Sequence, residues 1–199
     1  KKAQESNANT IANRVVQERS QIETTAYENP DNVPDLPFIW RSMEFARRDG
    51  VIALIVHGRL LFKRTDVADN ARRLIFDNLK ISGILNGADF SDDAVMWKIG
   101  APFCILFAWN RKPEGDETLQ VLSPHLDNST LFLPRLRLDP SRSKTVSVSA
   151  LKEEPYILKT LFRGTELDLS IMRKLESRLR DRPTQMARLG QYWEQELGL

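Results

Sequence analysis

The sequence predicts an α/β fold, half of a doubly wound sheet followed by a mainly helical C-terminal extension. Two observations support this prediction. The unbroken apolar runs at 51–56 and 103–109 are typical of central β-strands. Segments with helical periodicity alternate with strand patterns in the order helix, strand, helix, strand, loop, strand, which is the order of a layered α/β sheet.

Composition limits the classes of protein that the chain can represent. Its 199 residues are 41% hydrophobic, which is enough for a packed core and argues against global disorder. A net charge of +2 excludes a chain that binds nucleic acid through bulk charge. One cysteine, Cys104, and two distant histidines, His57 and His125, argue against a disulfide framework and against a metal site. No apolar run approaches the length of a membrane span, and no signal peptide opens the chain.

The charge is divided into three segments along the chain. Residues 41–80 and 135–199 each carry a local net charge of +4, whereas residues 81–134 carry −4. Ordinary solvated faces would explain this pattern. Alternatively, the two basic segments contact a polyanion.

We predict three regions: a polar lead-in over 1–34, a core over 35–112 and an extension over 113–199. The lead-in has a weak apolar stripe that predicts one helix with flexible residues. Because the first residues are polar and no Met opens the chain, we expect a fragment of a larger protein.

The core begins with a helix over 38–46. Asp35 is expected to cap this helix, and Gly50 to end it as a left-handed residue. The run 51–56 follows as a strand buried on both faces. A helix capped by Thr65 or Asp66 then runs to Asn78.

A short strand over 81–86 precedes an acidic loop and the second central strand at 103–109. Weak alternation over 127–138 and 141–149 indicates short strands or extended chain. A helix is predicted over 153–163. Thr165 and Asp168 form a capping box for a last long helix that ends near Arg180.

A search for catalytic motifs finds no glycine-rich nucleotide loop, no Walker sequence and no nucleophile elbow. Cys104 lies inside an apolar strand pattern, so we expect a buried structural thiol. His57 follows a strand, at the place where α/β folds bind ligands. A hydrogen-bonded structural histidine is an equally good interpretation of this residue.

Five segments in a consistent order resemble the N-6 adenine DNA methylases of restriction–modification systems. They are residues 36–63, 71–74, 81–86, 100–107 and 158–168. The first resembles a helix, a glycine turn and a buried strand that lie just downstream of the catalytic motif in that family. The next three resemble the following helix, strand six and the hairpin strand seven, and the last resembles a stretch that follows the methylase core.

The resemblance implies the C-terminal half of a Rossmann-like, S-adenosylmethionine-dependent methyltransferase sheet. The implied activity is site-specific methylation of adenine N6 in DNA, in a cytoplasmic restriction–modification or phage-defence system, with extrusion of the target base. The cofactor loop of the family is missing. Asn29-Pro30 lacks the second proline and the aromatic of the family's Asn-Pro-Pro-aromatic motif. The catalytic motif is therefore expected upstream of Lys1, the fragment alone is expected to be inactive, and S-adenosylmethionine is expected only in the full-length parent.

The resemblance also implies residues that contact DNA. In the family, an aromatic in the loop before the hairpin strand packs against the extruded base. Trp97, with Phe90 as the runner-up, stands in this loop, although a hydrophobic plug over the sheet is an equally good interpretation of Trp97. The candidate DNA-binding residues are His57, Arg59, Lys63, Arg64, Arg72 and Arg73.

Three kinds of partner follow from this reading: DNA, the rest of the parent polypeptide or other restriction–modification subunits, and a second copy joined through an open sheet edge. Half a doubly wound sheet exposes an edge where its remaining strands belong. The alternative function is a non-catalytic α/β module that binds DNA or a subunit.

Overall fold

The structure is a computed structural model that describes residues 2–20, 27–30, 34–63, 65–90, 101–127, 135–139, 143–154 and 156–180. The chain divides into two compact units, residues 1–162 and 163–199.

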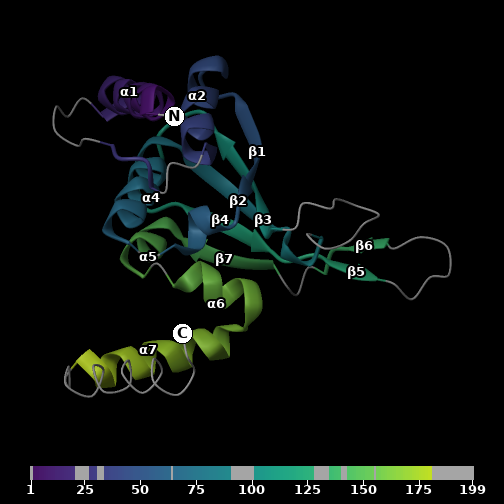
Figure 1. The fold of residues 1–199 in the computed structure, drawn as a ribbon. Helices are drawn as coiled ribbons and strands as arrows, with labels where there is room; N and C mark the ends of the chain where they lie inside the picture. Colours follow the sequence, from purple (N-terminus) through teal and green to yellow (C-terminus); the bar gives the residue numbers. More distant parts are fainter. Residues whose placement is uncertain are drawn as a thin grey trace. The chain divides into compact units, whose positions relative to one another are not determined.

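A five-stranded mixed sheet organises the first unit (Figure 1), in the order β1-β3-β2-β4-β7. Its strands are β1 (Val51–His57), β2 (Lys80–Asn86), β3 (Phe103–Trp109), β4 (Thr118–Leu122) and β7 (Ser143–Ser147). β3 is antiparallel to both β1 and β2, β4 is parallel to β2, and β7 is antiparallel to β4. The predicted α/β class is confirmed, and the two apolar runs lie side by side. A separate hairpin pairs β5 (His125–Asp127) with β6 (Arg135–Arg137).

One face of this sheet forms the core. In β1, β3 and β4, alternate residues point to the same face because strand side chains have a period of two. Ile52, Leu106 and Val121 belong to this covered face and are at most 5% exposed. Helices α4 and α5 contact each other and lie beside the sheet (Figure 1), α4 contacting β2 and α5 contacting β7.

The opposite face is open over β1 and β3. Val51, Ile55 and Trp109 are 64%, 47% and 42% exposed, and the register places Val51 directly opposite Trp109. The expectation that 51–56 is buried on both faces is therefore wrong. In the described sheet β1 is an edge strand, and its residues Val51 and Ile55 are exposed on one face, so this apolar run is buried on the other face alone.

The helices follow the predicted order closely. Their bounds are α1 (Lys2–Ser20), α2 (Asp35–Phe45), α3 (Arg59–Phe62), α4 (Asp66–Asn78), the 3₁₀ turn η2 (Ala88–Phe90), α5 (Val148–Glu153), α6 (Ile157–Arg163) and α7 (Glu166–Arg180). The predicted Thr65 cap of α4 is confirmed, because its Oγ1 accepts the backbone N–H of Ala68 at 3.3 Å.

Two predictions about α2 are wrong. Its N-cap is Pro34, without a side-chain hydrogen bond, and Asp35 is already the first helical residue. The left-handed residue after the helix is Asp49 (φ 58°) rather than Gly50. Close packing explains the glycine at position 50 instead, since a Cβ there would lie 2.9 Å from the carbonyl oxygen of Arg47.

The helix predicted over 153–163 begins later, as α6 at Ile157, and a separate short helix, α5, precedes it over Val148–Glu153 with Glu154 as its C-cap. In the second unit, the capping box is confirmed. Thr165 N–H donates to Asp168 Oδ2 at 2.6 Å, and Asp168 N–H donates to Thr165 Oγ1 at 3.4 Å. Helix α7 exposes an apolar stripe of Leu167, Ile171 and Leu175. No helix in the described ranges is long and apolar enough to cross a membrane.

Candidate functional site

The carboxyl end of β1 is held by α2. The backbone N–H of His57 donates to Asp35 Oδ2 at 2.7 Å, so the carboxylate at the start of α2 is bound to the last residue of the strand. Gly58 N–H donates to the Pro102 carbonyl at 2.9 Å. A Cβ on Gly58 would lie 3.2 Å from Phe62 and from this carbonyl, so close packing explains the glycine.

The six DNA-binding candidates differ in accessibility. His57 and Lys63 are half-buried and Arg73 is exposed, its guanidinium donating to the Lys152 carbonyl at 3.3 Å. The Arg72 side chain is 7% exposed and bonds to Asp69 and, at 2.6 Å, to the Lys63 carbonyl. Arg72 therefore stabilises the start of α4 rather than facing solvent. The Arg59 side chain and Arg64 lie outside the described residues.

Of the two stacking candidates, Trp97 lies outside the described residues. Phe90, at the end of η2, is only 5% exposed, so its ring belongs to the packing of this region.

Cys104 is fully buried, and its Sγ lies 3.7 Å from the Val56 carbonyl. Burial, with a smaller contribution from the charge of Asp35, raises the pKa of the Cys104 thiol to about 12. The expected buried structural thiol is confirmed.

The outer edge of β1 pairs with no other strand in the part of the chain that the structure describes. Gly58 bonds to Pro102, and the Asn110 N–H bonds to the Gly50 carbonyl at 2.8 Å, so the even-numbered residues of β1 face β3. The odd-numbered residues then face outward, and the outward N–H of His57 is already bonded to Asp35. The backbone groups of Val51, Ala53 and Ile55 lie beside no strand of the described chain.

At the opposite end of β1, Asn110 joins four segments. Its Nδ2 donates to the carbonyls of Met43, Ala46 and Arg47, at 2.9, 2.7 and 3.2 Å, where α2 ends. Its backbone N–H and carbonyl bond to Gly50 and Asp49. Its Oδ1 accepts a hydrogen bond from Arg19, near the end of α1. Asn110 is 4% exposed, and its side chain and backbone together fix the ends of two helices to the start of β1.

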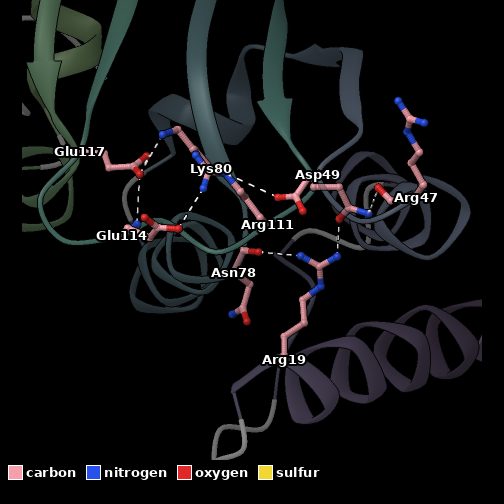
Figure 2. Close-up of polar contacts among 9 residues, drawn as sticks. Arg19, Arg47, Asp49, Asn78, Lys80, Arg111, Glu114 and Glu117 are labelled. Atoms are coloured by element: carbon pink, nitrogen blue, oxygen red, sulfur yellow. Dashed lines mark hydrogen bonds and ion pairs between the residues drawn. The ribbon is translucent and has the colours of Figure 1, made fainter.

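Arg19 and the Lys80–Glu117 pair extend this polar region (Figure 2). The Arg19 guanidinium also donates to the Asn78 carbonyl at 2.9 Å, and burial lowers the pKa of Arg19 against a smaller opposing effect of Glu18. Burial alone would raise the pKa of the Glu117 carboxyl. Hydrogen bonds from Lys80 Nζ (2.9 Å) and the Glu114 N–H (3.1 Å), with the charges of Lys80 and Arg111, outweigh burial and lower it.

A cavity of about 570 Å³ lies beside this network. α1 contributes Glu18 and Arg19, the end of α2 and the turn after it contribute Arg48, and the segment after β3 contributes Arg111 and Lys112. Four cationic side chains and one carboxylate therefore line the cavity. Among the described residues, no group of three or more His, Cys, Asp or Glu side chains could hold a metal ion.

Sequence reasoning missed Asn110 and Arg19. An asparagine directly after an apolar strand is a signal for a strand end, but nothing local shows that two helices end beside it. The cofactor implied by the resemblance finds no cradle at the described carboxyl end of β1, because Gly58 is used for packing against Phe62. No step of a reaction is therefore assigned to residues of this chain.

The fold is similar to parts of restriction–modification proteins. A chain from a type I restriction–modification complex is 15% identical, with a TM-score of 0.49, over 83% of this chain and 40% of that one. The type IIG restriction endonuclease BpuSI is 13% identical (TM-score 0.44; 86% and 20% covered), and the M protein of the type I enzyme EcoKI is 18% identical (0.39; 51% and 22%). The chain thus spans between a fifth and two fifths of these proteins. No protein-family model and no curated protein sequence matches it.

Proposed function

We propose that this chain is the rear part of a DNA adenine-N6 methyltransferase of a restriction–modification or phage-defence system. The observation that carries the proposal is the way three strands pair. β2 and β3, which resemble strand six and the hairpin strand that follows it, pair antiparallel from Lys80–Trp109 to Asn86–Cys104. The strand that resembles the one before them, β1, pairs with the other side of β3.

In this proposal the described residues support the reaction rather than perform it. The S-adenosylmethionine loop and the Asn-Pro-Pro-aromatic motif belong to sequence that this chain does not contain. S-adenosylmethionine would supply the methyl group in the assembled enzyme. His57 and Lys63 at the carboxyl end of β1, and Arg73 on α4, would contact DNA phosphates, and Trp97 would stack on the extruded base.

Methylation by the polypeptide that carries this chain tests the proposal. Adenine-containing duplex DNA and S-adenosylmethionine are incubated with that polypeptide, and N6-methyladenine is measured by mass spectrometry of the digested DNA. We expect N6-methyladenine with the complete polypeptide and none with this chain alone. If the complete, folded polypeptide methylates no adenine in a library of random sequences, the proposal is wrong.

DNA affinity tests the assigned surface separately. Lys63→Ala/Arg73→Ala should weaken DNA binding by about three- to tenfold and reduce the salt dependence, because each phosphate contact releases counterions. Lys159→Ala/Arg47→Ala removes two exposed cations elsewhere on the same unit and is the matched control. Equal weakening by both pairs would reject the assignment of this surface.

The edge of β1 favours a second candidate, a subunit-binding module whose partner adds a strand to the sheet. We infer that a second copy of this chain fits this edge. An antiparallel pair centred on Ala53 would place Val51 of one copy opposite Ile55 of the other. All the outward backbone groups of 51–55 would then be bonded, and the exposed apolar residues would form one continuous surface.

A further inference from the structure

The cationic cavity is a second polar region of the molecule, apart from the DNA surface proposed above. It lies near Val51, at the start of β1, whereas His57 lies at the other end of the same strand. Seven residues of extended chain separate these ends by roughly 20 Å. The cavity therefore needs an explanation of its own, and the inference drawn from it does not depend on the proposed function.

Within the described chain, the Arg19 cation of this cavity is not paired with a carboxylate. Its described hydrogen bonds go to neutral acceptors, the Asn78 carbonyl at 2.9 Å (Figure 2) and the side-chain oxygen of Asn110. Burial disfavours the protonated form of this group and so lowers the pKa of Arg19. An anion beside Arg19 would offset this desolvation.

Two further cations, Arg48 and Lys112, extend from exposed positions into the lining of the same cavity. Within the described chain neither side chain makes a hydrogen bond or an ion pair. Arg111, in contrast, is already bonded to Glu114 at 2.9 Å and lies 3.8 Å from Asp49 Oδ1. Arg48 and Lys112 are therefore the cations that can bind an incoming anion.

A purely structural role explains only part of this arrangement. Cations stabilise the carboxyl ends of helices, and Arg19 bonds to Asn78, the last residue of α4. This role does not account for Arg48 and Lys112, which bond to no helix terminus among the described residues. Nor does Glu18, the one carboxylate in the lining, balance Arg19, Arg48 and Lys112.

We propose that this cavity binds a phosphate group, carried by a free phosphate compound or by a nucleic-acid strand. Arginine guanidinium groups bind phosphate oxygens with two parallel hydrogen bonds, and lysine adds a point charge. The volume of about 570 Å³ lies within the range of small-molecule sites and would hold a diphosphate or one or two nucleotides. Glu18 would oppose the bound anion and weaken binding.

Two probes distinguish the sources of the phosphate. Inorganic pyrophosphate is titrated by calorimetry, and a labelled oligonucleotide of twelve thymidines by fluorescence anisotropy, both at low and at physiological salt. Arg48→Ala/Lys112→Ala should weaken binding of the effective probe by about tenfold, as expected for the loss of charge-assisted hydrogen bonds. Binding of pyrophosphate would identify a free phosphate compound, and binding of the oligonucleotide alone would identify a nucleic-acid strand.

Matched variants make the result decisive. Arg47→Ala/Lys159→Ala removes the same charge from positions outside the cavity lining, and Figure 2 shows the Arg47 side chain directed away from Arg19 and Arg111. This control should change the dissociation constant less than twofold. Glu18→Gln should tighten binding about two- to threefold by removing a like charge. If neither probe binds, if the control weakens binding as much as the cavity variant, or if Glu18→Gln weakens binding, the proposal is overturned.

Discussion

The two faces of the five-stranded sheet are built from the same strands but differ in what covers them. Ile52, Leu106 and Ala108 on the covered face are at most 5% exposed, while Val51, Phe107 and Trp109 on the other face are 38% to 64% exposed. All six residues are apolar, so hydrophobicity alone does not decide burial. The open face therefore has the composition of a protein interior, but no layer of the described chain buries it.

The largest expected difference in stability between the two faces is at a pair of isoleucines, one on each face. Ile84 in β2 belongs to the covered face and is 1% exposed, whereas Ile55 in β1 is 47% exposed. We expect Ile84→Ala to lower the free energy of unfolding by about 2–5 kcal/mol, since it leaves a cavity. Ile55→Ala should cost about 1 kcal/mol or less. Urea denaturation of both variants measures this difference, and equal losses would contradict the assignment of the two faces.

Asn110 directly follows β3, and by the alternation of strand side chains it belongs to the covered face, like Leu106 and Ala108. We expect Asn110→Ala to lower the free energy of unfolding by about 2–3 kcal/mol, because three carbonyls at the end of α2 and the Arg19 guanidinium lose a partner. Asn86→Ala is the matched control. Asn86 is similarly buried, but its side chain bonds only to Ser123 and to the Ala88 N–H, so a loss near 1 kcal/mol is expected. A larger loss in the control would show that Asn110 is not the central contact.

Acid titration tests how much the Lys80–Glu117 ion pair contributes to stability. The pKa of Glu117 is lowered in the folded chain, so the charged carboxylate stabilises the fold above its unfolded pKa, and this stability is lost as the pH falls through the folded pKa. We expect Glu117→Gln to remove up to about 1 kcal/mol of stability at neutral pH and almost none in strong acid. Thermal denaturation between pH 7 and pH 2 measures the effect. A constant difference across this range would contradict it.

The smallest change in stability is expected at the free edge of β1. Ala53→Pro removes an N–H that points away from β3, so the strand can retain its ladder and unfolding should change by less than about 1 kcal/mol. Pairing with a second copy would lose its central hydrogen bonds. Sedimentation at increasing concentration should show dimers for the unaltered chain and monomers for the variant. A monomeric unaltered chain at high concentration would reject the pairing.

The sequence was sufficient wherever the signal is local. The start of α4 at Thr65, the box of Thr165 and Asp168, and strand β3 follow from neighbouring residues, so they could be predicted. The lateral order of strands depends on distant pairing. An apolar run such as 51–56 therefore did not reveal that β1 lies at an edge. Strand β4 was not predicted, although Leu119 and Val121 alternate with polar residues.

The candidate site was less predictable than the fold. His57 was expected at a strand exit, and it lies there, but its contact with Asp35 depends on how α2 packs. Arg72 looks like any helix arginine in the sequence, and only the structure shows it bonded to Asp69 and the Lys63 carbonyl. The cationic cavity joins residues 19, 48 and 112, which no sequence window contains together.

The contacts of Asn110 also determine how this part of the molecule opens. One amide bonds to the last turn of α2, the turn before β1 and the guanidinium of α1, so none of these segments can separate from β3 without breaking bonds to the same side chain. Protection from deuterium exchange should therefore be shared. The amides of Ala46, Asp49 and Asn110 should exchange at similar rates, as one cooperative opening unit rather than as three independently fraying ends.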